Sequence, residues 1–510
     1  MWLHIESLAI VLRNIIVYHW KRYHYLVMWF TRVVQDEDAE TLLEKSPGTS
    51  KTEYLFVAGI SWRFLPRLLL DGIFHCLVFI VPTFLRRTPS SLQRSEKWSQ
   101  QVSTTQKKHR TEYLDGVRGL GSFIVFIFHW VVPRWPGIES GYVSGAEDAS
   151  LWQLPFINFA YAGSAMVSIF FVVSGYVLTH RFVLKMHRQQ YDSLFSDLSS
   201  LAFRRGLRLF LPSLVSCMLV YLCISLHLVP AQNTGETVSY RLETLITDLD
   251  HVSNPWSWDI YLGALYNYQL WTITFEYRGS MAVFIMVLGL ARCRTSVRML
   301  VEALTIAHAF GHQRWGIALF VAGLLISEID VRVSSSAYLK ELMQKKRAKS
   351  ALVVVVLLGI FFCGVPRLNA DQSFGYSFLQ YSWPFDAGYR PRFWVAIGAI
   401  LVIGPMPFLP FLQSFFCTRL MRYLGNVSFA LYLTHVLSKT VVGEWLLYVT
   451  WNMLGNEERW NYALGLVVST TLYTPIAIWF ADVFWRAVDI PSTTVTKWLE
   501  SRCLAMVTST

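Results

Sequence analysis

The chain has 510 residues, of which 54% are hydrophobic and only 15% are charged, a composition typical of a polytopic membrane protein. The formal net charge of +11 could indicate a nucleic-acid partner, but integral membrane proteins place such an excess in cytosolic loops beside anionic lipid. We therefore expect no nucleic-acid binding. The seven cysteines form no CxxC pair, so neither a disulfide framework nor a metal site is predicted.

The N-terminal region contains apolar and aromatic stretches that charged side chains such as Arg13 and Lys21 interrupt. This pattern favours an amphipathic or interfacial segment over a signal peptide. Residues 86–110 are rich in Ser, Gln, Lys and Arg, which is typical of a flexible linker. We assign residues 1–110 to an N-terminal amphipathic or interfacial segment and a basic linker.

Residues 111–490 predict an all-α, polytopic membrane bundle of about ten transmembrane helices, because long apolar segments alternate with short polar loops. We expect a short cytosolic tail over residues 491–510. The ten predicted spans are 114–135, 157–181, 208–229, 265–291, 298–312, 314–328, 350–366, 392–412, 423–446 and 461–485.

The charges of the loops predict the orientation of the bundle. If residue 110 is cytosolic, every strongly basic loop (182–207, 292–297, 329–349 and 413–422) falls on the cytosolic side. The acidic loop 230–264 falls on the other side. Both ends of the core are therefore predicted to be cytosolic, in a multi-pass protein of an endomembrane or the plasma membrane.

The first predicted span is entered through Asp115 and Arg118 and carries His129 within its apolar run. An ionisable residue in a spanning helix is costly, so it marks a candidate functional site. Eleven residues make almost a whole number of helical turns, which places Arg118 and His129 on one face, about 16 Å apart.

A cluster of arginines precedes the third predicted span. Arg204 and Arg208 share one helical face, and Arg205 flanks them. The cluster is either an ordinary basic membrane edge or a phosphate clamp for an anionic cytosolic donor.

Three further polar side chains lie within apolar segments. Glu276 and Arg278 are two residues apart in the fourth span, so each needs a partner on another helix. They belong either to a structural ion pair between helices or to a functional site. His435, midway along the ninth span, is either a hydrogen-bonded core histidine or a functional one. The chain lacks the Walker A, dinucleotide GxGxxG, HExxH, GxSxG and HxxxD signatures.

Five segments of the chain form an ordered series. They are Leu-Asp-Gly-Val-Arg-Gly with His129, Ser-Ile-Phe-Phe-Val-Val-Ser-Gly-Tyr-Val-Leu (168–178), Arg-Arg-x-x-Arg-x-x-x-Pro (204–212), Leu-Trp-Thr-x-x-x-Glu-Tyr-Arg-Gly-Ser (270–280) and Gly-Asn-Val-Ser-Phe-Ala-Leu-Tyr-Leu-Thr-His (425–435). Together they resemble the acyltransferase 3 family of ten-span membrane O-acyltransferases, over about residues 110 to 490. Glu-Tyr-Arg-Gly-Ser and the long basic N-terminal extension are similar to the filamentous-fungal branch of that family.

The resemblance implies transfer of an acyl group, usually acetyl from acetyl-CoA as a co-substrate, to a hydroxyl group. It implies no bound cofactor and no metal. The catalytic residues would be His129, Arg118 and Glu276, and the CoA phosphates would meet Arg204, Arg205 and Arg208. Asp115, Arg278, His435 and Ser174 would support the substrate or the catalytic groups. An imidazole suits this chemistry because the acceptor hydroxyl must lose a proton.

The chemistry of the acceptor stays open at this point. A small molecule, such as a fungal secondary metabolite, is the favoured acceptor, and a cell-surface carbohydrate is the alternative. From another class, intramembrane His, Glu and Arg also suit a proton-coupled transporter. A catalytically idle scaffold is the third possibility. The sequence leaves the acyl chain, the choice between direct transfer and an acyl-histidine intermediate, and the oligomeric state undetermined.

Overall fold

The computed structural model describes residues 81–83, 111–135, 137–144, 150–230, 237–256, 266–381 and 389–503. The chain divides into the units Met1–Arg87 and Thr88–Thr510, and the helices below belong to the second unit. The predicted interfacial segment and linker of residues 1–110 lie outside the described residues, apart from 81–83.

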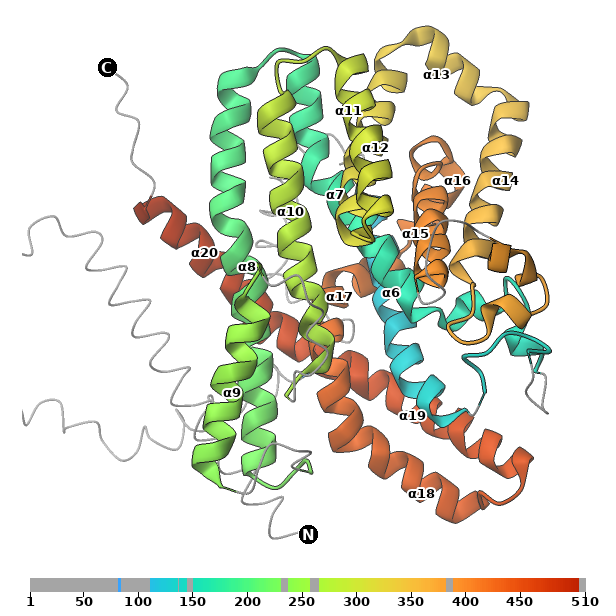
Figure 1. Ribbon diagram of the computed structural model, residues 1–510. Coiled ribbons are helices and arrows are strands. Elements are labelled where there is room, and N and C mark those ends of the chain that lie inside the picture. The colour runs from blue at the N-terminus through green and yellow to red at the C-terminus, as the bar shows by residue number, and fades with distance from the viewer. Residues whose placement is uncertain are drawn as a thin grey trace, which may run out of the picture. The chain divides into compact units, whose positions relative to one another are not determined.

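The described part of the second unit is an assembly of helices without a β-strand, which confirms the predicted all-α class (Figure 1). The α-helices are α6 (Glu112–Val131), α7 (Gly163–His187), α8 (Tyr191–Ser225), α9 (Val238–Ser253), α10 (Trp271–Leu290), α11 (Thr295–Gly311), α12 (Trp315–Ser335), α13 (Ala337–Gln344), α14 (Lys346–Cys363), α15 (Arg390–Ile403), α16 (Pro410–Phe416), α17 (Arg419–Ser438), α18 (Glu444–Leu454), α19 (Arg459–Phe484) and α20 (Ile490–Cys503).

Six helical stretches are long and apolar enough to cross a membrane, so the chain is a multi-pass membrane protein. They are Glu112–Arg134, Gly163–His187, Tyr191–Ser225, Tyr268–Leu290, Arg390–Phe408 and Arg459–Cys503. Each of the ten predicted spans falls on a helix, but the count of ten is not confirmed. Four of the predicted spans fall on α11, α12, α14 and α17, which are shorter or more polar than the six stretches named above.

Charged residues in α11 and α12 find partners inside the bundle. The buried Arg298 guanidinium donates to both carboxylate oxygens of Glu328, at 2.6 and 2.9 Å. The buried Asp330 carboxylate accepts a hydrogen bond of 2.7 Å from Tyr176 on α7. Since buried charges are stable only when paired, these contacts explain how a segment with acidic residues packs in the core.

Two predicted loops are largely helical. The basic loop of residues 182–207 shrinks to the short connection between α7 and α8, because α8 begins at Tyr191. The acidic loop of residues 230–264 contains α9, whose polar and apolar residues are segregated. Tyr266 anchors this helix by donating its hydroxyl to the Arg241 carbonyl at 2.6 Å. Burial and the nearby Asp248 carboxylate raise the pKa of Tyr266 to about 12.

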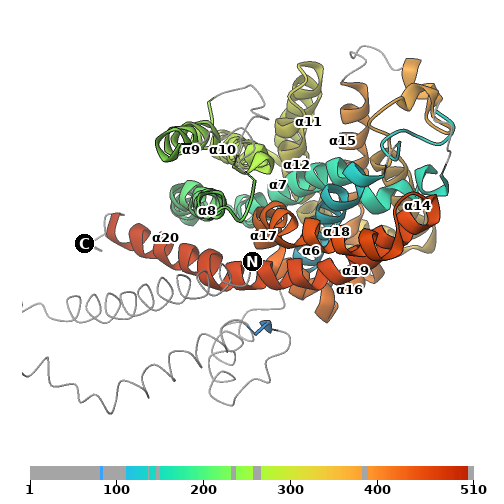
Figure 2. The same ribbon diagram turned by 90° about the horizontal axis from the view of Figure 1, so that it is seen from below.

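The arrangement of the helices places α6 between α7 and α17, with α10 packed against α7, α8 and α12 (Figures 1 and 2). The helices α19 and α20 join through the π-helical turn Trp485–Asp489 and run obliquely across the bundle from α18 to α8. A second π-helical turn, Lys439–Gly443, joins α17 to α18.

Small residues let α6 and α17 touch along their backbones. A Cβ atom on Gly119 would lie 2.4 Å from the backbone nitrogen of Gly425, and one on Gly425 would lie 2.5 Å from the carbonyl oxygen of Asp115. Side chains larger than hydrogen at this crossing would force the helices apart. The crossing fixes the spacing of the two helices that carry His129 and His435.

We expect Gly119→Ala to lower the thermal unfolding midpoint of the detergent-solubilised protein, because overpacking costs about 1–3 kcal/mol. Gly289→Ala is the matched control, since no atom lies within 4 Å of the added Cβ in the same kind of helical setting. That control should leave the midpoint unchanged or raise it. Equal midpoints for the two variants would contradict this view of the crossing.

Candidate active site

Two polar centres lie along α6. The first is a cavity of about 440 Å³ near the N-terminal half of α6, which we call the arginine cavity. It is enclosed by α6, α7, α8, α10, α17 and the π-helical turn before α20. Its polar lining consists of Asp115, Arg118, Ser122, Ser174, Arg205, Arg208, Thr272, Glu276, Asn426, Ser428, Tyr432 and Asp489.

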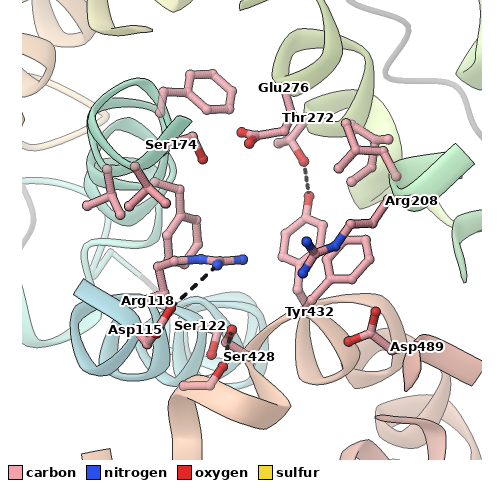
Figure 3. Close-up of a pocket in the computed structure, with 18 of the residues that line it drawn as sticks. Asp115, Arg118, Ser122, Ser174, Arg208, Thr272, Glu276, Ser428, Tyr432 and Asp489 are labelled. Atoms are coloured by element: carbon pink, nitrogen blue, oxygen red, sulfur yellow. Dashed lines mark hydrogen bonds and ion pairs between the residues drawn. The ribbon is translucent and has the colours of Figure 1, made fainter. Parts of the chain in front are cut away.

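Arginine side chains dominate the charge of this cavity. Arg118 and Arg208 reach into it from α6 and α8 on opposite sides (Figure 3). Among the described residues, Arg118 forms a long ion pair of 3.9 Å with Asp115, and both side chains are partly exposed. Arg208 has no carboxylate oxygen within 4.0 Å among the described residues. Two guanidinium groups are thus available to an anionic ligand.

Arg205 and Glu276 form an ion pair that joins α8 to α10 at the wall of the cavity. The same guanidinium donates through Nε to the hydroxyl of Ser280 at 2.9 Å. Both members of the pair are mostly buried, with 13% and 15% of their side chains exposed. The predicted need of Glu276 for a partner on another helix is thus met by Arg205.

Because removal of one partner from a buried ion pair leaves an uncompensated charge, we expect Glu276→Gln to reduce stability by about 3 kcal/mol. The double variant with Arg205→Gln should recover part of this loss. Glu444→Gln is the control, because Glu444 pairs with Arg134 but is 49% exposed, and exposed pairs contribute about 1 kcal/mol or less. Thermal unfolding of the purified proteins measures the stability of Glu276→Gln, of the double variant and of the control. Equal destabilisation by Glu276→Gln and Glu444→Gln would contradict a structural role for the buried pair.

The second centre is a pair of histidines near the C-terminal ends of α6 and α17. The rings of His129 and His435 stack with centroids 5.2 Å apart and an angle of 29° between their planes. The hydroxyl of Tyr268 lies 3.2 Å from Nδ1 of His129. We call these three residues the histidine centre.

His435 has a defined tautomer in this arrangement. Its Nδ1 lies 2.8 Å from the Tyr432 carbonyl oxygen and 3.1 Å from that of Leu431, so it must carry the proton and donate. Its Nε2 is then an acceptor, and this buried atom has no hydrogen-bond partner among the described residues. The tautomer of His129 is open, because the Tyr268 hydroxyl can donate or accept.

The two centres are one helical turn apart on two helices. On α10 and the turn before it, Tyr268 contacts His129 and Thr272 lines the arginine cavity. On α17, Tyr432 lines the cavity and His435 stacks on His129. Arg118 lines the cavity while His129 does not, although the sequence places both on one face of α6.

The remaining predicted residues are placed differently. Arg204 does not line the cavity and instead pairs with Glu500 at 3.0 Å. Arg278 lies over the ring of Phe275 at 4.5 Å and lines a separate cavity of about 270 Å³ beside Arg314 and Arg392. Asp115 and Ser174 both line the arginine cavity, as Figure 3 shows.

Four residues of the two centres were not predicted from the sequence: Tyr268, Thr272, Tyr432 and Asp489. Asp489 could have been found as a charge close to an apolar segment, and Thr272 and Tyr432 lie within two of the motifs quoted above. Each centre also adjoins a π-helical turn: Asp489 belongs to one, and the other begins soon after His435. Such turns are frequent at functional sites. Among the described residues, no three His, Cys, Asp or Glu side chains could together hold a metal ion.

The comparison with known protein families identifies the chain. Residues 111–486 match the acyltransferase 3 family, described as an acyltransferase domain. The chain belongs to the acyltransferase 3 family. It is therefore an enzyme that transfers acyl groups, and the resemblance noted in the sequence is confirmed.

Three curated relatives come from fungi and are named as acyltransferases or as an O-acetyltransferase. The chain is 25% identical over 448 residues to the O-acetyltransferase PaAT-1 of Phomopsis amygdali, covering 80% of this chain and 88% of the relative. It is 25% identical to an acyltransferase of a Phoma species over 458 residues, covering 75% and 94%. Acyltransferase clz18 of Cochliobolus lunatus is also 25% identical, over 452 residues, with 75% and 94% covered. No solved structure gives a significant match.

Proposed function

We propose that this acyltransferase transfers an acetyl group from acetyl-CoA to a hydroxyl of a small molecule, at a site between the arginine cavity and the histidine centre. The observation that carries the proposal is the position of two available guanidinium groups, Arg118 and Arg208, within a cavity one helical turn from His129 and His435. An anionic donor and a basic imidazole are the two components that such a transfer requires.

The donor is assigned to the arginine cavity because CoA carries phosphate groups that arginine binds in bidentate fashion. Arg118 and Arg208 supply this contact in the proposal, and Arg205 orients Glu276 instead. Arg204 is left out of the phosphate site because it pairs with Glu500. If the N-terminal end of α6 is cytosolic, as the loop charges predict, the cavity is open to the cytosolic pool of acetyl-CoA.

His129 is the proposed catalytic imidazole. In the direct route it removes the proton from the acceptor hydroxyl, whose oxygen attacks the thioester carbon. The carbon–sulfur bond breaks, and the proton passes to the sulfur of CoA, so the products are an ester and free CoA. In the second route His129 first carries the acyl group and then yields it to the acceptor. Both routes use the same residues and the same overall balance of atoms.

The acetyl group and an oxygen atom as its acceptor are supported by the name of one relative. PaAT-1 is named an O-acetyltransferase, and all three relatives are fungal. A secondary metabolite with a free hydroxyl is the acceptor class we propose, with a cell-surface carbohydrate as the alternative. The lipid bilayer is the other expected partner, because six helical stretches suit a membrane.

The test uses membranes that contain the full-length protein, acetyl-CoA labelled in the acetyl group, and an extract of candidate hydroxyl compounds. We expect labelled ester in the extractable small-molecule fraction and free CoA in equal amount. Label in polysaccharide instead would favour the carbohydrate acceptor. Saturable uptake of a substrate without any labelled ester or released CoA would contradict the proposal and favour a transporter.

A further inference from the structure

The cavity of about 270 Å³ that Arg278 lines is distinct from the arginine cavity, and we call it the α12–α15 cavity. Three segments distant in sequence supply its positive charges, with Arg278 on α10, Arg314 before α12 and Arg392 on α15. None of the described residues that line it is acidic. His312 also borders the cavity, but it is exposed and its Nδ1 lies 3.0 Å from the His308 carbonyl oxygen, so we leave it out of the site. A hollow lined by charges of one sign attracts a ligand of the opposite sign.

Two aromatic rings hold arginines of this cavity by their flat faces. Phe275 and Trp315 stack with ring centroids 5.6 Å apart and an angle of 26° between their planes. The guanidinium of Arg278 lies 4.5 Å from the centroid of Phe275. That of Arg392 lies 5.9 Å from the centroid of Trp315. Contacts of this kind position the face of a guanidinium without consuming the N–H donors along its edge, and such donors bind oxyanions.

Two helices begin at the α12–α15 cavity. α12 begins at Trp315 and α15 at Arg390, and no side chain caps either N-terminus. Gly316 and Ile317, in the first turn of α12, line the cavity. The first N–H groups of a helix lack partners within the helix, and the positive end of its dipole favours an anion. Both helix ends therefore add to the positive potential that the three arginines create.

The charge of the cavity indicates which anion fits it. The three arginines carry three positive charges, and within the described part of the chain Arg392 has no carboxylate partner. A carboxylate ligand would supply one negative charge, whereas a phosphate monoester carries about 1.5 to 2 near neutral pH. Phosphate also accepts bidentate hydrogen bonds from arginine. A phosphate group therefore matches this cavity better than a carboxylate does.

We propose that the α12–α15 cavity binds a phosphate group of a ligand other than the acyl donor, through Arg278, Arg314 and Arg392. If the N-terminal end of α6 is cytosolic, α11 starts at a cytosolic loop and leads away from it for 17 residues, or about 25 Å, before the cavity is reached. The cavity then lies far from the cytosolic pool of acetyl-CoA. The phosphate belongs either to a phospholipid headgroup or to a soluble compound, and its binding does not depend on which acyl group or acceptor the enzyme uses.

The test measures the affinity of purified full-length protein for inorganic phosphate, through the thermal unfolding midpoint in an uncharged detergent at constant ionic strength. Every sample carries Arg118→Gln and Arg208→Gln, which remove the guanidinium groups assigned to the donor. A ligand that binds the folded state raises the midpoint. We expect Arg392→Gln and Arg314→Gln each to raise the apparent Kd about 10-fold or more, because a hydrogen bond to a charged group is lost. Arg332→Gln, an exposed residue of α12 outside the cavity, should change it by no more than about 2-fold.

A second arm identifies the source of the phosphate. The same proteins are placed in nanodiscs of phosphatidylcholine with or without phosphatidic acid. A higher midpoint with phosphatidic acid, lost in Arg392→Gln, would assign the site to a lipid headgroup, whereas a response to inorganic phosphate alone would assign it to a soluble compound.

Two outcomes would overturn the proposal: no response of the parent protein to either probe, or an equal response in the parent and in both cavity variants. Arg314 lies in an exposed turn, so its variant carries the test if Arg392→Gln does not fold. Acyl transfer is not the readout, so the result is independent of the function proposed above.

Discussion

His129→Ala is expected to abolish nearly all acyl transfer while the protein still assembles in the membrane. His129 carries the imidazole of α6, and its ring is held between His435 and the Tyr268 hydroxyl. Removal of a general base costs about 10²–10⁴-fold in rate, and loss of a covalent carrier would cost at least as much. Labelled ester formed from acetyl-CoA, at equal amounts of membrane protein, measures the loss in kcat.

His312→Ala is the control for this variant. His312 is an exposed histidine just after α11, and its ring nitrogen contacts only the nearby carbonyl of His308 among the described residues. We expect it to retain wild-type transfer. If His129→Ala were as active as His312→Ala, the histidine centre would have no chemical role.

Arg208→Gln should raise the KM for acetyl-CoA with a much smaller effect on kcat at saturation. The side chain reaches into the arginine cavity opposite Arg118, where it would meet a phosphate of the donor (Figure 3). A hydrogen bond to a charged group contributes about 1.5–3 kcal/mol, which corresponds to a rise of about 10- to 100-fold in KM. Because the phosphates do not react, the contact is equally strong in the ground state and in the transition state.

Arg204→Gln is the matched control, because Arg204 lies one helical turn away on α8 and points to Glu500 rather than into the cavity. Loss of this partly exposed pair should change the KM by no more than about 2-fold. A larger rise in KM for Arg204→Gln than for Arg208→Gln would contradict this assignment and would indicate that the donor binds on the side of α8 where Arg204 lies.

The sequence was sufficient for the fold class, because long apolar runs have few other solutions in a membrane. The predicted count of about ten spans is not confirmed, since α11 has only 17 residues and α12 carries acidic groups near its end. Whether such helices belong to the bundle depends on partners such as Arg298 for Glu328, which lie on a different helix. Pairwise contacts of this kind are invisible to composition.

The candidate site was predictable in part. Helical periodicity placed Arg118 and His129 on one helix, and both remain in the proposed site. The distinct tasks of Arg204, Arg205 and Arg208 could not be predicted, because their partners come from distant segments. Adjacent residues on α8 point in different directions, and the packing of α10 and α20 against α8 decides that Arg205 and Arg208 line the cavity while Arg204 does not.

The central claim is that donor binding and acyl transfer are carried out by two adjacent but separate centres. Calorimetric titration of purified wild type, His129→Ala and Arg208→Gln with a thioether analogue of acetyl-CoA tests it most directly. We expect His129→Ala to bind the analogue within about 3-fold of the wild-type affinity. Arg208→Gln should bind it about 10- to 100-fold more weakly, because a charged hydrogen bond is lost. A loss of affinity in His129→Ala equal to that in Arg208→Gln would contradict the separation.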